Sequence, residues 1–163
     1  KRGVIAHKGK MVDASFVEVP RQRNTREENN LLKEGIVPAD WLDNPNKLCQ
    51  KDMEAGWTKK NNITYFGYKD HIKGDTKSKI ITDYDVTPAN VHDSQPIGGL
   101  LNKQDVDQPL YADSAYRSEE IEKMVEKKKI QSKIHEKGYR GNPLTAGQLK
   151  RNNKKSFQIV DLN

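Results

Sequence analysis

Met11-Val12-Asp13-Ala14-Ser15-Phe16 and Leu110-Tyr111-Ala112-Asp113-Ser114-Ala115-Tyr116 are two apolar stretches that each carry one aspartate. Both have the composition of β-strands, and the two aspartates are a hundred residues apart. An unpaired carboxylate buried in a strand costs on the order of several kcal/mol, so such a residue usually faces a metal, an opposite charge or a cleft. We predict that Asp13 and Asp113 belong to one shared site.

The rest of the chain predicts further strands and helices around these two stretches. Strands are expected at residues 10–17, 65–72, 79–86, around Asp113 and at 130–134, and helices at 25–33, 46–53, 90–101 and from 118. The strands at 65–72 and 79–86 form a hairpin in this prediction. The order is that of a mixed five-stranded sheet of the ribonuclease H type, in which the first and fourth strands are parallel neighbours. We therefore expect an α/β fold with helices flanking that sheet.

Another class of fold that places acids on strands is less compatible with the residues. A phosphatase of the haloacid dehalogenase type needs a second aspartate two residues after the first. Position 15 is a serine, which argues against that chemistry.

The domain organisation follows from length and composition. A chain of 163 residues with 33% apolar residues can bury one core, so we expect a single domain over residues 1–163. Residues 20–62 form a polar insertion after the first strand, too long for a plain loop. Trp41 and Trp57 are expected to attach it to the body of the domain.

Charge, cysteine content and hydropathy narrow the class of protein. The net charge is +6, and residues 123–155 hold eleven Lys or Arg against two acids, which suggests a surface for a polyanion such as DNA or RNA. A solvated face without a partner is the alternative. The single cysteine and the absence of a long apolar run favour a soluble protein in a reducing, cytoplasmic setting, with no membrane segment.

Several motifs together resemble the catalytic domain of bacterial insertion-sequence transposases of the DDE type, from about Met11 to about Ser156. The residues that carry the resemblance are Val12-Asp13-Ala14-Ser15-Phe16-Val17, Pro20-Arg21-Gln22-Arg23-Asn24-Thr25-Arg26-Glu27-Glu28-Asn29, Gln50-Lys51-Asp52, Trp57-Thr58-Lys59-Lys60, Tyr65-Phe66-Gly67-Tyr68-Lys69, Val86-Thr87-Pro88-Ala89-Asn90-Val91-His92-Asp93-Ser94 and Tyr111-Ala112-Asp113-Ser114-Ala115-Tyr116-Arg117-Ser118.

The resemblance implies a ribonuclease H-like fold and a metal-dependent enzyme that cuts DNA strands and transfers them at insertion-sequence ends. By matching position, Asp13 and Asp113 are the first two catalytic carboxylates and bind Mg²⁺ or Mn²⁺. Two such ions about 4 Å apart can stabilise the attacking and leaving oxygens of a phosphoryl transfer. The implied partners are double-stranded DNA, as terminal inverted repeats and as target, and further copies of the chain in the active complex.

The sequence departs from the family near its end. The family has a third acid, a glutamate, shortly after the segment that resembles residues 152–156, whereas residues 157–163 here lack that motif. The nearest late acids are Glu136 and Asp161. We therefore expect a domain that is incomplete at its C-terminus, with an impaired metal site. The alternatives are an inactive remnant that binds DNA or a partner transposase, and a nuclease that completes its site with Glu136.

The remaining candidates each have a simpler interpretation. Arg21, Arg23, Arg26, Lys59 and Lys60 are expected to contact DNA phosphates, although single basic residues in polar loops are more often only solvated. From the residues alone, the two aspartates could also be structural carboxylates at strand ends. His92 and Asp93 fit the start of a helix, and Tyr65, Tyr68 and Tyr116 fit the core. Gly56 stands where many relatives carry arginine, which predicts a weaker DNA contact.

Overall fold

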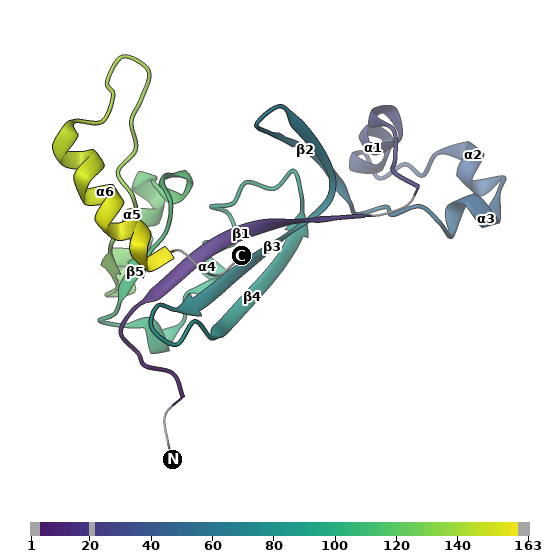
Figure 1. Cartoon of the computed structure of the whole chain (residues 1–163). Helices are drawn as coiled ribbons and strands as arrows, with labels where there is room; N and C mark the ends of the chain where they lie inside the picture. The colour runs from purple at the N-terminus through teal and green to yellow at the C-terminus, as the bar shows by residue number, and fades with distance from the viewer. Residues whose placement is uncertain (1–3, 20–21, 160–163) are drawn as a thin grey trace. The chain divides into compact units, whose positions relative to one another are not determined.

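The computed structural model describes residues 4–19 and 22–159 and has the α/β fold that the sequence predicts. Its sheet contains β1 (Lys10–Glu18), β2 (Gly56–Lys60), β3 (Ile63–Asp75), β4 (Ile81–Pro88), β5 (Pro109–Tyr111) and β6 (Gln131–Ser132). The strands follow the order β2-β3-β1-β5-β6, and β4 pairs with β3 (Figure 1). Because β1, β5 and β6 are parallel and β2 and β3 are antiparallel, the sheet is mixed. This curled six-stranded sheet, flanked by helices, is ribonuclease H-like.

The sheet has six strands, one more than the five that the sequence predicted. The added strand, β2, lies within the segment that the sequence assigned to the polar insertion, and it pairs with β3 from Gly56 opposite Gly67 to Lys60 opposite Ile63. In β2, Trp57 and Thr58 are followed by two lysines, so the strand lacks an apolar alternation and gives a weak signal. The turn at Asn61 and Asn62, both at positive φ, is what returns the chain into β3.

The chain divides into two compact units. The first contains residues 1–15, 71–85 and 93–163, and the second contains residues 16–70 and 86–92. The long strands β1, β3 and β4 contribute residues to both units. The expectation of a single domain with an insertion at 20–62 remains a prediction.

The first unit holds the main apolar core. Val12 of β1 and Leu110 of β5 pack there with residues of α4 (Ile97–Leu100) and α5 (Glu119–Lys127). Helix α5 begins where predicted because the Ser118 hydroxyl accepts a hydrogen bond from the amide of Ile121, and three glutamates in its first turn suit the helix dipole. The unit also contains the short 3₁₀ helices η1 (Lys103–Asp105) and η2 (Ser114–Tyr116) and the last helix, α6 (Ala146–Ile159), which the sequence analysis did not anticipate.

Buried charges in the first unit are paired. The ammonium group of Lys73, on β3, lies 2.8 Å from Asp105 and 2.7 Å from Asp83. Lys73 and Asp105 are each 1% exposed in their side chains. Because a buried charge is tolerated only when it is paired, this contact fixes η1 against the end of β3.

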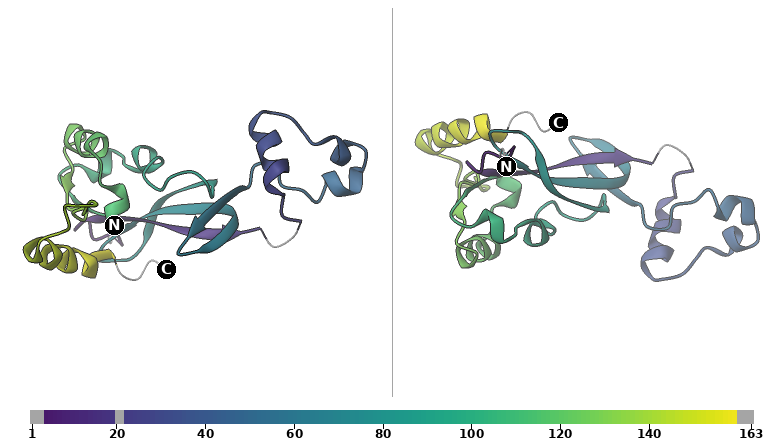
Figure 2. Two further views of the ribbon diagram at one scale, coloured as in Figure 1. Left: turned by 90° about the horizontal axis from the view of Figure 1, so that it is seen from above. Right: turned by 90° about the horizontal axis from the view of Figure 1, so that it is seen from below.

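The second unit contains three helices that Figure 2 shows grouped together: α1 (Arg26–Lys33), α2 (Ala39–Leu42) and α3 (Pro45–Leu48). Helix α1 begins as predicted, with a capping box between Thr25 and Glu28. The helix expected at 46–53 ends at Leu48 instead. Asp52 favours a turn there, because its carboxylate accepts hydrogen bonds from the amides of Glu54 and Ala55.

Gly67 shows why the strands of this unit can approach closely. It has a φ of +148°, and a Cβ atom at this position would lie 2.2 Å from the carbonyl oxygen of Val17. No other residue type fits this approach of backbone to backbone.

Candidate functional site

Asp13 lies in β1, and Asp113 follows β5, the parallel neighbour of β1. In the register of β1 and β5, Lys10 is opposite Leu110 and Met11 is opposite Tyr111. Counted two residues further along the sequence, the same offset makes Asp113 the counterpart of Asp13. The parallel pairing of the first and fourth predicted strands is therefore confirmed. Residues a hundred positions apart in the sequence reach the same end of this strand pair. We call Asp13 and Asp113 the acidic pair.

The two aspartates of the acidic pair have different local structures. Asp13 is half-buried within β1, and its Oδ1 accepts a hydrogen bond of 2.8 Å from the amide of Ala14. Asp113 is exposed and lies two residues beyond β5, which ends at Tyr111. The prediction that Asp113 is inside a strand was therefore wrong. Its Oδ1 accepts 2.7 Å from the amide of Ala115 and caps η2, a local bond that competes with strand pairing.

Tyr116 is a core residue that also borders the acidic pair. It is 1% exposed and belongs to the main core cluster. Burial raises the pKa of its phenol, and the negative charges of Asp93, Asp13 and Asp113 raise it further. The sequence analysis assigned Tyr116 only to the core, because its apolar neighbours gave no sign of this second environment.

Asp93 is not at the start of a helix. The helix expected at 90–101 is reduced to α4, which begins at Ile97, after Pro96. Proline disfavours the helical conformation of the residue before it, so residues 90–95 form turns instead. The interpretation of His92 and Asp93 as helix-starting residues was therefore wrong.

The chain after β6 continues alongside β5 and reaches the neighbourhood of Asp113. The amide of Lys133 donates to the carbonyl of Leu110 at 2.9 Å, and the amide of His135 donates to that of Ala112 at 3.0 Å. Burial lowers the pKa of His135, and the charge of Lys155 lowers it further, while Asp113 opposes the shift. The imidazole is therefore neutral at neutral pH.

Helix α6 is held against this segment by its polar side chains. The Asn152 amide group bonds both backbone groups of Glu136, each at 2.9 Å, in the manner of a neighbouring strand. Lys155 donates to the carbonyl of Ile134 at 3.0 Å. Two bonds from Arg151, of 2.7 and 3.1 Å, engage both carboxylate oxygens of Glu136 and lower its pKa to about 2. Glu136 therefore forms an ion pair with Arg151. Asp161, the other late acid, lies outside the described residues.

The acidic pair has the chemistry of a divalent cation site without a complete set of protein ligands. Within residues 4–19 and 22–159, no three His, Cys, Asp or Glu side chains are grouped to hold a metal ion. Mg²⁺ is commonly bound through one or two carboxylates, with water and substrate phosphates as the other ligands. Two aspartates, one within β1 and one directly after its neighbour β5, fit that requirement.

The second unit contains a pocket with basic walls. Its volume is about 290 Å³. It is lined by Arg26, Asn29, Asn30, Lys33, Trp57, Thr58, Lys59 and Thr64. We call this the basic pocket. It unites two of the predicted DNA-contacting residues, Arg26 from α1 and Lys59 from β2, and adds Lys33, which the sequence analysis did not select.

The other predicted DNA-contacting residues are not in the lining of the basic pocket. Arg23 forms a half-exposed ion pair of 2.9 Å with Glu18. The ammonium group of Lys60 lies 5.6 Å from the centre of the Phe16 ring. Arg21 lies outside the described residues. Gly56 faces Asn90, since a Cβ atom at position 56 would meet the Asn90 side-chain oxygen at 1.9 Å.

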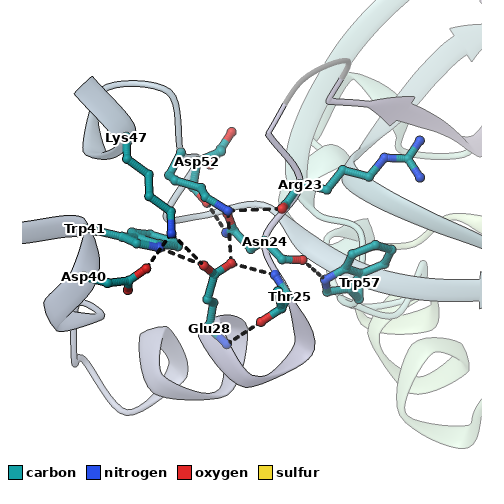
Figure 3. Close-up of polar contacts among 10 residues, drawn as sticks. Arg23, Asn24, Thr25, Glu28, Asp40, Trp41, Lys47, Asp52 and Trp57 are labelled. Atoms are coloured by element: carbon teal, nitrogen blue, oxygen red, sulfur yellow. Dashed lines mark hydrogen bonds and ion pairs between the residues drawn. The ribbon is translucent and has the colours of Figure 1, made fainter. Parts of the chain in front are cut away.

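A partly buried polar cluster around Glu28 fixes the helix that carries Arg26 (Figure 3). The Glu28 carboxylate accepts hydrogen bonds from the Thr25 amide at 2.7 Å, the Trp41 indole at 2.8 Å and Lys51 at 3.0 Å. Burial opposes ionisation of Glu28, but these donors together lower its pKa. Trp41, in α2, is 0% exposed. The Trp57 indole donates a hydrogen bond to the Asn24 carbonyl, and its ring lies 4.9 Å from that of Phe66 of β3, tilted by 43°.

The fold and the acidic pair together define a ribonuclease H-like domain of the kind found in DNA transposases. The chain belongs to this class: the family model described as the transposase DDE domain matches residues 6–159.

Among relatives, the chain is 35% identical over 142 residues to the transposase for insertion sequence element IS1106 of Neisseria meningitidis serogroup B. The match covers 87% of this chain and 46% of that protein, so the chain spans about half the length of this relative. No solved structure matches the chain. No helix in the described parts of the chain combines the length and apolar character needed to cross a membrane.

Proposed function

We propose that this chain is the catalytic core of a DNA transposase, which cleaves DNA strands at insertion-sequence ends and transfers them to target DNA in a metal-dependent reaction. The observation that carries the proposal is the parallel pairing of β1 with β5, which puts the segments that carry Asp13 and Asp113 side by side. Membership of the transposase DDE domain family supports it.

In this proposal Asp13 and Asp113 hold Mg²⁺ or Mn²⁺ through their carboxylate oxygens. The bound cation would supply Lewis-acid stabilisation of the attacking and leaving oxygens of the phosphodiester. A backbone amide donates to one oxygen of each aspartate and orients its carboxylate. Asp13 is held within β1, and Asp113 is held at the N-cap of η2, directly after β5.

DNA binding is assigned to the basic side chains. Arg26 and Lys59 provide two cations in one pocket of the insertion, and Arg21, Arg23 and Lys60 are further candidates. Residues 123–155 add an excess of lysine and arginine. Phosphate contacts of this kind give affinity that falls steeply with salt, without sequence specificity. Action on terminal inverted repeats, assembly with further copies and a cytoplasmic location are part of the same proposal.

The test is nicking of supercoiled DNA in Mg²⁺ or Mn²⁺, with the parent chain, Asp13→Asn and Asp113→Asn, and with Asp107→Asn as a matched control. Asp107 is an exposed turn residue at positive φ, where asparagine is well tolerated. The proposal predicts nicking by the parent and the control alone. Salt-sensitive DNA binding without nicking by any protein would instead indicate an inactive core that only binds DNA.

A further inference from the structure

The basic pocket of the second unit has more positive charge than a single backbone phosphate needs. Among the described residues, its lining includes Arg26, Lys33 and Lys59 and no carboxylate. Within residues 4–19 and 22–159, none of these three cations forms an ion pair. All three residues are exposed. The pocket can therefore offer three cations to one anion.

The cations come from two walls. Arg26 and Lys33 are seven residues apart on α1, so they lie on one face of that helix. Lys59 of β2 is paired with Thr64 of β3, and directly opposite residues of two strands point to the same face of a sheet. Both faces line the same pocket, so the positive charge is not confined to one wall.

Two hydrogen bonds tie the walls together. The side-chain amide of Asn29, on α1, donates to the carbonyl of Ala55, the residue before β2, at 3.1 Å. Asn29 is only 7% exposed. The Trp57 indole of β2 donates at 2.9 Å to the carbonyl of Asn24, which lies two residues before α1. The walls are therefore held in place before a ligand binds, which lowers the cost of ordering them around it.

The size of the pocket favours the end of a DNA strand over its continuous backbone. Its volume of about 290 Å³ is close to the lower limit of about 300 Å³ for pockets that hold small molecules. An internal phosphodiester has one negative charge and continues on both sides. A phosphate monoester carries about −1.5 to −2 charges at neutral pH and presents three acceptor oxygens. Three cations in a small pocket therefore match a monoester better than a diester.

We propose that the basic pocket binds the phosphate monoester at the end of a cleaved DNA strand. In hydrolysis of a phosphodiester, the oxygen of water bonds to phosphorus, one phosphorus–oxygen ester bond breaks, and a proton of the water passes to the released oxygen. One new end is then a hydroxyl, which is the nucleophile for strand transfer. The other end is a phosphate monoester, and the pocket holds it. The inference rests on the proposed function only for the source of this end.

The experiment measures binding of the full chain to short oligonucleotides of one sequence with an internal fluorophore, by fluorescence anisotropy. The oligonucleotides differ only in having a 5′-phosphate, a 3′-phosphate or hydroxyls at both ends. We expect the parent to bind at least one phosphate-ended form about tenfold more tightly than the hydroxyl-ended form. Lys33→Gln and Lys59→Gln, one in each wall, should remove this preference. Lys103→Gln removes the same charge at an exposed position in η1 and should keep it.

The outcomes separate this inference from the proposed function. Equal affinity of the parent for all three oligonucleotides overturns the inference. An equal loss of affinity for all three in Lys33→Gln also overturns it, because the pocket then contacts only internal phosphodiesters. If inorganic phosphate competes as well as the phosphate-ended oligonucleotide, the pocket holds free phosphate and not a strand end. A preference for phosphate ends in a parent chain that nicks no DNA would overturn the proposed cleavage and leave the binding of phosphate ends in place.

Discussion

Met11 and Tyr111 are paired in the parallel register of β1 and β5, and each lies two residues before an aspartate. Met11 is fully buried, so the pair anchors the two strands in the core. This relationship fixes where the carboxylates of Asp13 and Asp113 emerge. It also means that changes at the aspartates can be tested without disturbing the pairing itself.

Substitutions at Asp113 are expected to separate its structural role from its catalytic one. Asp113 caps η2 through the amide of Ala115. Asparagine caps about as well as aspartate, whereas alanine costs about 1 kcal/mol. We therefore expect Asp113→Asn to keep the unfolding free energy and lose nicking by at least about 100-fold. Asp113→Ala is expected to lower both the unfolding free energy and the nicking activity. Urea denaturation with a nicking assay checks this, and full nicking by Asp113→Asn would contradict it.

The basic pocket is expected to bind DNA through phosphates. Arg26→Ala and Lys59→Ala should each weaken DNA binding and lower the slope of log affinity against log salt by about 1. Lys103→Ala, at an exposed position in η1, is the matched control. Fluorescence anisotropy at several salt concentrations provides the measurement. Equal salt slopes for all four proteins would exclude the basic pocket from DNA contact.

Glu28 is expected to stabilise the insertion far more than its neighbour Glu27. Glu28→Ala leaves the fully buried Trp41 indole without its acceptor and removes the partner of Lys51. An unsatisfied buried donor costs about 1–3 kcal/mol. Glu27→Ala changes an exposed residue in the same helical turn and should cost less than about 0.5 kcal/mol. Chemical denaturation measures the unfolding free energy of both variants. Similar losses of unfolding free energy would show that the polar cluster is not stabilising.

The buried contact of Lys73 with Asp105 gives a prediction for the first unit. Asp105→Ala leaves the ammonium group of Lys73 with only the partly exposed Asp83, so we expect a loss of about 3 kcal/mol in unfolding free energy. Asp83→Ala should cost about 1 kcal/mol or less. Urea denaturation of both variants measures the loss of unfolding free energy. A larger loss for Asp83→Ala than for Asp105→Ala would contradict the prediction that the buried contact contributes more.

The ion pair of Glu136 with Arg151 is expected to contribute a pH-dependent stability. Because the folded pKa of Glu136 is lowered to about 2 from its ordinary 4.5, the contribution is present above pH 4.5 and is lost as the pH falls towards 2. The side chains are solvent-accessible, so salt should weaken the effect. The difference between parent and Glu136→Gln in unfolding temperature, followed with pH, measures it. Unchanged nicking by Glu136→Gln would also exclude Glu136 as a replacement for the third acid.

The fold was largely predictable because its strongest elements have local signals. The strand containing Asp13, the helix capped by Thr25 and the helix capped by Ser118 each combine periodicity with a start signal. The predictions failed where a local signal was overridden. Pro96 precedes α4, so this helix begins at Ile97 and not at the predicted residue 90. The Asp113 carboxylate caps η2, so β5 ends before Asp113.

The candidate site was predictable only in part. Asp13 and Asp113 were selected as carboxylates in apolar stretches and again through the resemblance, and the structure pairs the strands beside them. The second environment of Tyr116 was missed because its residue type is not unusual in its own segment. Its packing with Val12 joins segments that are far apart in the sequence.

The sequence by itself determined the family, the order of strands and helices, and the two aspartates, because motifs, periodicity and capping residues act over a few neighbouring positions. Only the tertiary structure decided which groups share an environment. The register of β1 with β5 brought the segments of the two aspartates side by side, and core packing buried Tyr116 with Val12 and Ala112, the residues that precede them. Such proximity depends on contacts across about a hundred residues, and these contacts form only when the sheet closes.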